Sequence, residues 1–364
     1  MTKSKTIGLA IAAMVSGGVS ATAVTAAYGQ DFTLRGERVE VVLPYSPGGS
    51  ADAYGRLIAK YLQPHLPGNP TVIVRNEPGA GAIAGTNNFD ANADADGTML
   101  LVTSTSTQMN YLLQDSRVNY DLTQMTPVVV NPLGMMVYVR EELGIESAEE
   151  LPAILDTPIR SGAHTPTSAD LVQLIEFHIL GLDVEPVFGL QRGDAKQAFE
   201  RGEIQISYDN PLAYSTYVEP MVEAGIAKPI YTMGYVDASG DHVVDPAFPD
   251  LPTFPETVET VTGEAPSGPA YDAWQTMFFS RVMASKSVQL PRGTSPEIVE
   301  AYRQAAEAMT QDPAYIEAIE SLTGGYPTLY GQEAADRWQQ SLQFDSESRE
   351  WLRNWLVETY DVSL

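Results

Sequence analysis

Short apolar runs alternate with helical patterns along the first third of the chain. The run "VEVVL" at 39–43 predicts a buried strand, and the apolar spacing of 51–62 predicts a helix directly after it. Two more strand–helix pairs follow, with strands at 71–76 and 97–104 and helices at 81–93 and 106–114. Such alternation is typical of open, mostly parallel sheets with helices on both faces, so we expect an α/β fold.

The middle of the chain contains a second α/β stretch. Residues 127–142 have the pattern of two strands that meet at Asn131, Pro132 and Gly134, which we interpret as a crossing between domains. Ser147 and Glu150 have the spacing of a capping box at the start of a helix. A return crossing is predicted at 228–235.

The C-terminal part is predicted to be helical after a proline-rich surface stretch at 245–255. Its four helical patterns lie at 295–309, 312–325, 331–344 and 346–360. The predicted organisation is a signal peptide at 1–29, domain 1 at 32–132 plus 231–364, and domain 2 at 133–230.

The first residues have the pattern of a secretory signal peptide. Lys3 and Lys5 precede a short apolar run at 7–15, and small residues follow it. A membrane-spanning helix needs about 20 apolar residues, so this run is too short to be an anchor. The protein is therefore expected to be exported, and the absence of cysteine excludes a lipid-anchored N-terminus.

Composition narrows the classes of partner and of chemistry. The chain has 47 Asp and Glu against 21 Lys and Arg, a net charge of −26, which argues against nucleic acid and anionic membranes as partners. Its four histidines, His65, His164, His178 and His242, lack the spacing of metal ligands, and no G-x-S-x-G nucleophile motif is present. We expect a monomeric binding protein with no catalytic residues, no metal and no cofactor.

Glycine-rich corners follow the first two predicted strands. Pro47, Gly48 and Gly49 precede one helix, and Gly79 and Gly81 precede the next. Glycines let a ligand approach backbone N–H groups, and a helix start adds unpaired N–H donors with a partial positive charge. These corners predict an anion site that needs no basic side chain.

The third corner is rich in hydroxyl groups, with Ser104, Thr105 and Ser106 at the start of a helix. In open α/β sheets ligands bind outside the carboxyl ends of the strands, where all three corners fall. If the three strands are neighbours, one pocket collects two helix N-termini and a set of hydroxyl groups. The competing interpretation of each corner taken alone is an ordinary βα turn.

A dinucleotide site is a weaker alternative. The stretch "GAGAIAG" at 79–85 has G-x-G-x-x-x-G spacing rather than G-x-G-x-x-G, and it follows the second strand rather than the first. The acidic residues Asp94 and Asp96 come too early for a ribose contact. An exported protein also rarely meets free nicotinamide cofactor.

The three corners together resemble the start of the tripartite tricarboxylate transporter substrate-binding proteins, the TctC or Bug family of periplasmic receptors. The likeness rests on "VVLPYSPGGSADAYGRLIAKYL", "VIVRNEPGAGAIAGTNNF" and "ADGTMLLVTSTS", and it continues through "IRSGAHTPTSADLVQLI" and "LPRGTSPEIVEAYRQAAEAM". It covers nearly all of the expected mature chain. The resemblance implies two α/β domains around a ligand cleft, with hinge closure on a small carboxylate.

The resemblance also implies a set of ligand-binding residues. From the three corners these are Tyr45, Ser46, Gly48, Gly49, Ser50, Gly79, Ala80, Gly81, Ser104 and Ser106. From the second domain they are Gly162, Thr165 and Asp209.

Departures from the family pattern fall where the ligand should be selected. His164 stands where a glycine is common, Phe188 stands for a tyrosine, and Arg192 lies close by in the sequence, so these three are candidate selectivity residues. The "GAGA" that ends at Ala82 replaces a frequent "GAGG". Arg192 or Arg75 could contribute charge, against the simpler interpretation of surface solvation. Tyr45, Phe188 and Tyr208 could stack on an aromatic acid, although aromatic residues in such loops more often pack.

The sequence therefore predicts a periplasmic solute-binding protein for a di- or tricarboxylate or an aromatic acid. Its expected partners are that carboxylate and the two integral membrane subunits of a tripartite tricarboxylate-type transporter. A solute receptor for a sensor kinase and an exported enzyme on the same scaffold are the alternatives.

Overall fold

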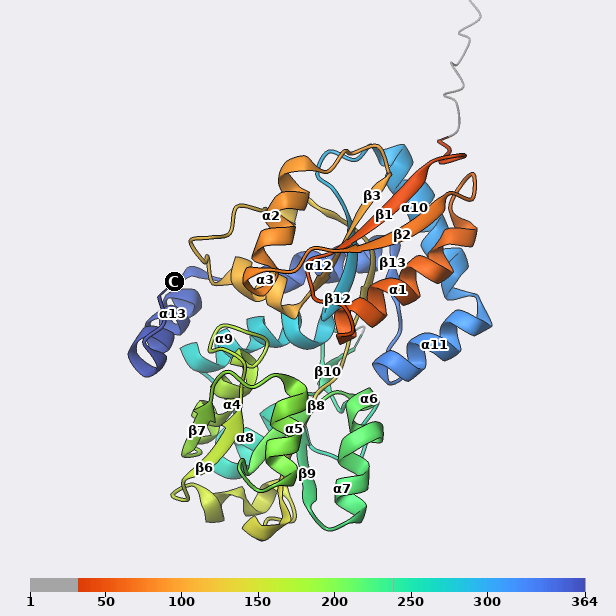
Figure 1. Cartoon of the computed structure of the whole chain (residues 1–364). Helices are drawn as coiled ribbons and strands as arrows, with labels where there is room; N and C mark the ends of the chain where they lie inside the picture. The colour runs from red at the N-terminus through yellow and green to blue at the C-terminus, as the bar shows by residue number, and fades with distance from the viewer. Residues whose placement is uncertain (1–31, 238, 364) are drawn as a thin grey trace, which may run out of the picture. The chain divides into compact units, whose positions relative to one another are not determined.

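The computed structural model describes residues 32–237 and 239–363 (Figure 1). The predicted signal peptide, 1–29, lies outside the described residues. The described strands are β1 Arg38–Leu43, β2 Thr71–Asn76, β3 Met99–Ser104, β4 Thr126–Asn131, β5 Met136–Arg140, β6 Ile159–Gly162, β7 Val184–Val187, β8 Ile206–Asp209, β9 Ala227–Thr232, β10 Tyr235–Val236, β11 His242–Val243, β12 Lys286–Leu290 and β13 Leu329–Tyr330.

The α-helices of the described residues are α1 Ser50–Leu62, α2 Ile83–Asn92, α3 Thr105–Leu112, α4 Leu171–Leu180, α5 Arg192–Glu200, α6 Pro211–Ala213, α7 Glu219–Glu223, α8 Phe254–Thr262, α9 Pro269–Phe278, α10 Pro296–Thr310, α11 Pro313–Thr323, α12 Gly331–Ser341 and α13 Ser346–Tyr360. Shorter 3-10 turns include η2 Ala80–Ala82 and η5 Ala148–Ile154, and π-helical turns occur at η6 Tyr214–Val218 and η7 Phe279–Met283.

The first sheet has the strand order β13-β4-β12-β3-β1-β2 within the described residues. Strand β1 pairs in parallel with β2 on one side and with β3 on the other. Strand β12 runs antiparallel to both β3 and β4, and β13 runs antiparallel to β4. Strands β1 to β4 therefore share one direction, which makes the sheet mostly parallel.

Alternate side chains of β1 bury against helices on opposite faces of this sheet. Val41 and Leu43 belong to a core shared with α1, α10 and α11, whose buried residues include Ile58 and Tyr302. On the opposite face of the sheet, Val42 packs with residues of α2 and α12, such as Trp338 of α12. Figure 1 shows α1, α10 and α11 together beside β1 and β2. The nearly continuous apolar run at 39–43 is thus buried on both faces, as a central strand requires.

The second sheet has the order β7-β6-β8-β5-β9 within the described residues. Strand β6 pairs in parallel with β7 and β8, whereas β5 is antiparallel to β8 and β9. Helices α4, α8 and α9 contribute to the core on one face, with Trp274 at its centre, and α5 and α7 contribute Phe199 and Met221 to the core on the other. The predicted fold class, two mostly parallel sheets flanked by helices, is confirmed.

The chain passes from the first sheet to the second between β4 and β5, through 132–135. After β9, helices α8 and α9 both contact α4. The chain then returns to the first sheet through β12. Helix α13 packs against α9. The exact domain boundaries given above remain a prediction.

The predicted capping box at Ser147 and Glu150 is wrong. Ser147 makes no side-chain cap, and Glu150 Oε2 accepts the N–H of Glu146 at 2.8 Å instead. The segment forms 3-10 turns rather than an α-helix and has Pro152 inside it. Proline has no N–H to donate, which disfavours a regular α-helix here.

Candidate ligand-binding site

The three predicted corners meet at the edge of the first sheet that is formed by the carboxyl ends of its parallel strands. Strand β1 lies between β2 and β3, and all three run in parallel, so their carboxyl ends at Leu43, Asn76 and Ser104 are neighbours. The connection order reverses between β1 and β3, because β2 lies on one side of β1 and β3 on the other. Such a reversal is a topological switch point, where open α/β sheets bind ligands.

Tyr45 joins the first corner to the third. Its hydroxyl accepts the backbone N–H of Ser104 at 2.7 Å and lies 2.5 Å from Thr107 Oγ1. Burial raises the pKa of Tyr45 far above its ordinary value, so the phenol stays protonated. The ring is half-buried, and its polar end is already engaged by the start of α3.

Asp52 joins the first corner to the second. Its carboxylate accepts the N–H of Gly48 at 3.0 Å, the Nδ2 group of Asn76 at 2.8 Å and the Nε group of Arg56 at 3.0 Å. The hydrogen bond from Arg56 contributes most to lowering the pKa of Asp52 to about 2, and the bonds from Gly48 and Asn76 lower it further against the effect of burial. Asp52 thus already accepts one of the N–H groups that the sequence assigned to an anion.

The start of α1 remains open. Gly49 is the N-cap and carries no side-chain cap, and Ser46, Gly48, Gly49 and Ser50 are all exposed. The first N–H groups of a helix have no intrahelical partner. They are the donors that a ligand can reach at this corner.

The second corner has an unusual backbone. Gly79, Ala80, Gly81 and Ala82 all have positive φ, of 151°, 48°, 66° and 78°. Glycine adopts such angles without cost, but alanine does not. Asn110 of α3 holds the loop through a 2.8 Å hydrogen bond from Nδ2 to the carbonyl of Gly81. Gly79, Ala80 and Gly81 are exposed at the same edge of the sheet.

The third corner supplies hydroxyl groups. Ser104 is the N-cap of α3 but makes no side-chain cap, and both Ser104 and Ser106 are half-buried. Thr105 between them is buried, and its Oγ1 has no hydrogen-bond partner among the described residues. This corner therefore retains polar groups that the protein itself does not satisfy.

Lys286 lies at the candidate site, and sequence reasoning missed it. It is the first residue of β12, and because β12 is antiparallel, Lys286 pairs with Ser104 and Asn131, the last residues of β3 and β4. It therefore lies at the same sheet edge as the three corners. Its side chain is buried, and its Nζ donates to Ser50 Oγ at 3.3 Å. Burial, with a further effect of Arg281, lowers the pKa of Lys286 to about 7.

The ligand-binding residues predicted in the second domain differ in their burial and in their hydrogen bonds. Gly162 is buried, and a Cβ there would come within 2.8 Å of Ala195 Cβ, so this glycine allows close packing of β6 against α5. Thr165 is half-buried, and His164 is exposed with its backbone N–H donating to Asp170 Oδ2 at 2.8 Å. The side chain of His164 makes no hydrogen bond within the described residues.

Asp209 is paired inside the protein. It accepts the hydroxyl of Tyr138 at 3.0 Å, and its oxygens lie 3.4 Å from Lys196 Nζ and 3.7 Å from Arg192 Nη2. An anionic ligand would gain nothing from this carboxylate directly. Asp209 instead holds Arg192 and Lys196, the two cations of α5.

Arg192 belongs to the same network. Its guanidinium lies 3.9 Å from the ring centroid of Tyr208, donates to the Tyr208 carbonyl and lies 3.8 Å from Asp170 Oδ1. Burial opposes the charge of Arg192, but Tyr208, Asp209 and Asp170 together raise its pKa. Arg192 is thus positioned by protein groups on several sides.

Two other sequence candidates lie among packing and surface contacts. Phe188 is 38% exposed and packs edge-to-face on Tyr360 of α13 at a centroid distance of 5.4 Å. Arg75 pairs with Glu40 and Glu77 across the edge strand β2. Arg75 lies one residue before Asn76 at the end of β2, but its charge is paired with these two carboxylates.

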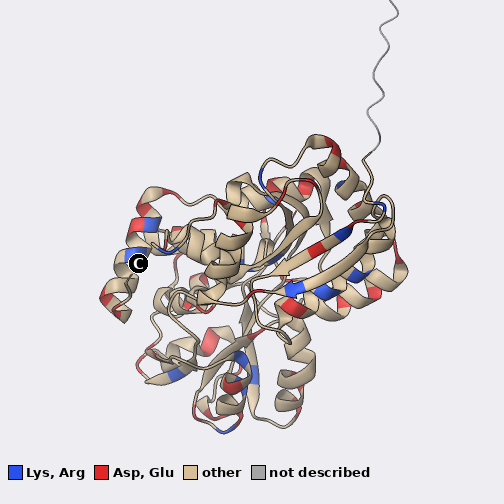
Figure 2. Ribbon diagram, turned by 45° about the horizontal axis from the view of Figure 1, so that its top comes forward, with Lys and Arg blue, Asp and Glu red and all other residues tan. Residues whose placement is uncertain are grey.

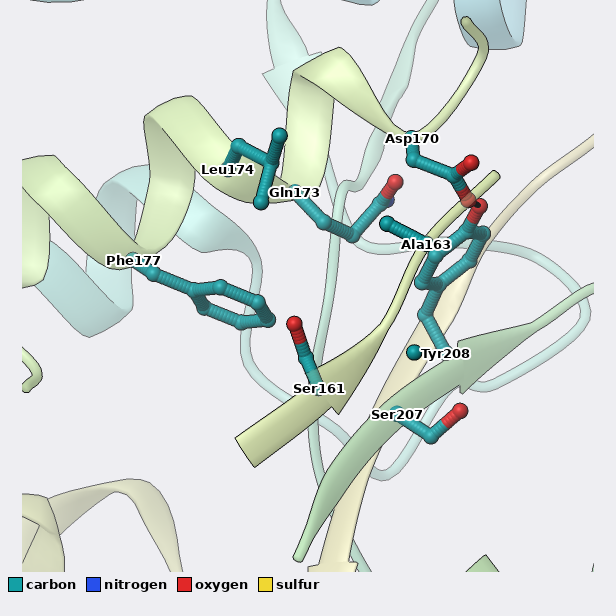
Figure 3. A pocket seen from close by; sticks show the side chains of 9 residues that line it. Ser161, Ala163, Asp170, Gln173, Leu174, Phe177, Ser207 and Tyr208 are labelled. Atoms are coloured by element: carbon teal, nitrogen blue, oxygen red, sulfur yellow. Dashed lines mark hydrogen bonds between the residues drawn. The ribbon is translucent and has the colours of Figure 1, made fainter. Parts of the chain in front are cut away.

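A small cavity lies between β6, β8 and α4 (Figure 3). It is lined by Ser161, Ala163, Asp170, Gln173, Leu174, Phe177, Ser207 and Tyr208, and Figure 3 shows the Asp170 carboxylate pointing to the Tyr208 hydroxyl, which donates to it. Its volume is about 10 Å³, enough for roughly one water molecule. The cavity is therefore too small to be the carboxylate site itself.

The histidines do not form a reaction centre within the described residues. His178 lies against Trp351 and Trp355, and His242 Nε2 lies 2.8 Å from the carbonyl of Met233. No group of three His, Asp or Glu side chains in the described ranges is placed to hold a metal ion. In the same ranges, no helix combines the length and apolar character needed to cross a membrane.

Comparison with known proteins places this geometry in a known fold. No protein-family model matches the chain. The chain is 33% identical over 118 residues to the protein BugT of Bordetella pertussis, a match that covers 32% of this chain and 35% of BugT. The chain thus aligns with about a third of the length of that relative.

Solved structures match over much more of the chain. A TctC solute-binding protein from Polaromonas is 17% identical with a TM-score of 0.62, covering 88% of this chain and 98% of that one. MatC from Rhodopseudomonas palustris, solved with bound malate, is 19% identical with a TM-score of 0.59, covering 86% and 99%. The resemblance to the TctC and Bug solute-binding proteins is confirmed. At these identities the solved structures establish the fold, that of two-domain periplasmic binding proteins.

Within this TctC-like fold, the three corners are neighbours, as the prediction of a single pocket required, but several side chains around them were not predicted. The three corners carry the residues predicted from the resemblance. Asp52, Asn76 and Asn110, which hold the corners, and Lys286, which lies behind them, were not predicted. An apolar alternation at 286–290 was the one signal in the sequence that could have located the strand of Lys286.

Proposed function

We propose that the protein is a periplasmic solute-binding protein that captures a small organic carboxylate and delivers it to a membrane transporter. The observation that carries the proposal is the convergence of three βα corners at the switch point of the first sheet. The open start of α1 and the hydroxyl groups of Ser104 and Ser106 supply donors there. Such donors suit a carboxylate better than a cation.

The ligand we propose is a dicarboxylate or a related small organic acid. MatC, of the same fold, was solved with malate, which supports this class. The residues we assign to the grip are Tyr45, Ser46, Gly48, Gly49 and Ser50 at the first corner. Those assigned at the other corners and in the second domain are Gly79, Ala80, Gly81, Ser104, Ser106 and Thr165. Gly162 and Asp209 support the second-domain loops in this proposal, through packing on α5 and through the pairs with Arg192 and Lys196.

The role of each group in this proposal is binding without chemistry. The helix starts hold one carboxylate of the ligand, Tyr45 and Asn110 keep the corners in place, and the loops of the second domain select the remainder. His164, Phe188 and Arg192 stay the selectivity candidates at those loops, and the N–H of Gly189, next to Phe188, donates to the carbonyl of His164 at 3.0 Å. Two integral membrane subunits of a tripartite tricarboxylate-type transporter are the proposed partners.

A thermal-shift screen of the exported, purified protein tests the proposal. Malate, other di- and tricarboxylates, aromatic acids and acidic amino acids are added singly. A ligand at 100 times its Kd stabilises the folded state by about 2.7 kcal/mol. Since each kcal/mol raises Tm by roughly 2–4 °C in domains of 150–250 residues, binding is easily seen. A well-folded protein that responds to none of these acids would refute carboxylate binding.

Gly49 is the position at which to test the grip. Its φ of −84° suits any residue, and an added Cβ would lie 3.9 Å from its nearest neighbour, Ser46 O, so the fold tolerates a side chain there. We expect Gly49→Ala to retain binding in part and Gly49→Phe to abolish it, because a bulky group covers the N–H donors of α1. Equal affinity of both variants would place the ligand elsewhere.

A further inference from the structure

Two buried cations near the candidate site form no ion pair with a carboxylate in the described part of the chain. Lys286 is 3% exposed and Arg281 is 9% exposed. Neither takes part in any ion pair among the described residues, although Arg192 pairs with Asp170 and Asp209. Burying a charge without a partner costs several kcal/mol in general, so such an arrangement calls for an explanation.

The ammonium group of Lys286 is only partly satisfied. It has three N–H donors, and the structure gives it one acceptor, Ser50 Oγ at 3.3 Å. Ser50 is exposed at the start of α1, so Nζ reaches the corner that we assign to the ligand. The same end of β12 carries Ser285, whose buried Oγ has no hydrogen-bond partner among the described residues.

Arg281 is similarly unsatisfied. Its Nη2 lies 3.0 Å from Met135 Sδ, a weak acceptor, and its buried Nε has no partner among the described residues. Its guanidinium lies 5.7 Å from the ring centroid of Tyr208 in the second sheet. Arg281 also lies close enough to Lys286 to help lower the pKa of that lysine. Two like charges near each other are more costly still, unless an anion joins them.

The acidic composition of the chain makes the absence of a carboxylate paired with Lys286 informative. With 47 acidic residues against 21 Lys and Arg, an internal partner would be easy to supply. Among the described carboxylates, Asp170 and Asp209 pair with Arg192 and Lys196. Asp170 and buried Glu176 act on Arg281 only from beyond ion-pair distance. In the proposed function the helix starts hold one carboxylate of the ligand, so the charge of Lys286 is left for a second anionic group.

We propose that Lys286, supported by Arg281, forms a cationic subsite that pairs directly with a carboxylate of the bound ligand. This assignment rests on the proposed function and refines it, since it predicts a ligand with at least two carboxylates. Lys286 then determines specificity. In the free protein the side chain of Lys286 is already buried, and the bound ligand supplies the carboxylate partner that Lys286 lacks.

The test compares Lys286→Met with Lys228→Met in the exported, full-length protein. Met preserves the length of the buried side chain but removes its charge. Lys228 pairs with exposed Glu146, so its replacement changes the net charge equally without affecting the site. Binding of malate and of other C4–C6 dicarboxylates is measured by calorimetry, beside the monoamide of each acid.

We expect Lys286→Met to weaken dicarboxylate binding by about 30-fold or more, the usual effect of removing one partner of a buried charge pair. The preference for the diacid over its monoamide should fall with it. Lys286→Arg should retain most of this preference, and Lys228→Met should behave like the wild type. Without ligand, Lys286→Met should unfold at a higher temperature than the wild type, because an unpaired buried charge is gone.

The outcomes separate the two proposals. If the wild type binds a dicarboxylate and Lys286→Met binds it equally well, the cationic subsite is refuted and the proposed function stands. A Lys286→Met protein that fails to fold, or is less stable without ligand, assigns the lysine a structural role and also overturns the subsite. If the wild type binds no carboxylate, the proposed function itself fails, and the subsite with it.

Discussion

Ala80 shows how the second corner departs from ordinary residue preferences. It is exposed and has φ of 48°, a left-handed conformation that costs a non-glycine residue about 1–2 kcal/mol. Ala82, two residues later, also has a left-handed conformation, with φ of 78°. The TctC and Bug proteins that the sequence resembles often have glycine at this position. Strain of this kind gathers at functional loops.

Replacing Ala80 by glycine should therefore stabilise the protein. We expect Ala80→Gly to raise the free energy of unfolding by about 1 kcal/mol, because glycine adopts a positive φ freely. Urea denaturation of the ligand-free protein measures this. Ala301→Gly is the control: Ala301 is half-buried in the middle of α10, so the same change should cost roughly 0.5–1 kcal/mol there. Destabilisation by both changes would mean that the left-handed alanine is not strained.

Individual site residues were predictable only where a local pattern carries them. Glycines and serines next to a strand end are visible in the sequence, and the structure places them at one sheet edge. The partners of Asp52 and Lys286 were not visible, because these contacts join residues 24 and 236 positions apart. A lysine in a short strand is also normally exposed, and nothing local marks this one as buried.

At the scale of elements, the strands and helices around the site were predicted well. Strand β2 has the predicted bounds of 71–76, and helices α10 to α13 match the four C-terminal patterns. Strand β12 and helices α8 and α9 were missed. Strand β12 inserts between β3 and β4 from far along the chain, and its place depends on non-local pairing that no short window of sequence records.

The link between the first two corners is an element-level feature that can be tested. Asn76 at the end of β2 donates to Asp52 of α1 at 2.8 Å and to the carbonyl of Tyr45 at 3.0 Å. We expect Asp52→Asn and Asn76→Ala each to lower the free energy of unfolding by about 1–2 kcal/mol. The double variant should lose less than the sum, since both changes break one bond. Strict additivity in urea denaturation would show that the two corners are held independently.

The effect of Asp52 should also depend on pH. The pKa of Asp52 is lowered to about 2 in the folded protein, and that of an unfolded aspartate is about 3.9. A lowered carboxyl pKa stabilises the fold fully above the unfolded value, and this contribution is lost as the pH falls through the folded value. The stability difference between wild type and Asp52→Asn should therefore be constant above about pH 5 and shrink toward pH 2.

At the scale of the whole molecule, the charge of −26 opposes the capture of an anion. Figure 2 shows acidic and basic residues scattered in short segments over the helices and loops of the described chain. The cations that we assign to the ligand, Lys286 and Arg281, are outweighed at long range by this net charge, so they attract an anion mainly at close range. A dicarboxylate approaching from solvent meets a repelling surface before it meets an attracting site.

This difference in range predicts an unusual salt dependence. The Debye length falls from about 30 Å at 0.01 M salt to about 8 Å at 0.15 M, which screens the distant acidic surface far more than contacts inside the site. We expect the association rate of a bound dicarboxylate to rise over this interval and its dissociation rate to change little, the opposite of attractive steering. Stopped-flow fluorescence measures both rates.

The monoamide of the same acid is the control for that experiment. It carries one negative charge fewer, so its association rate should rise less with salt. If the association rate of the dicarboxylate instead falls as salt is added, the local field of Lys286, Arg281 and Arg192 must extend into solvent and dominate the approach. The acidic surface would then have no part in the kinetics of capture, and the buried cations would steer the ligand as well as hold it.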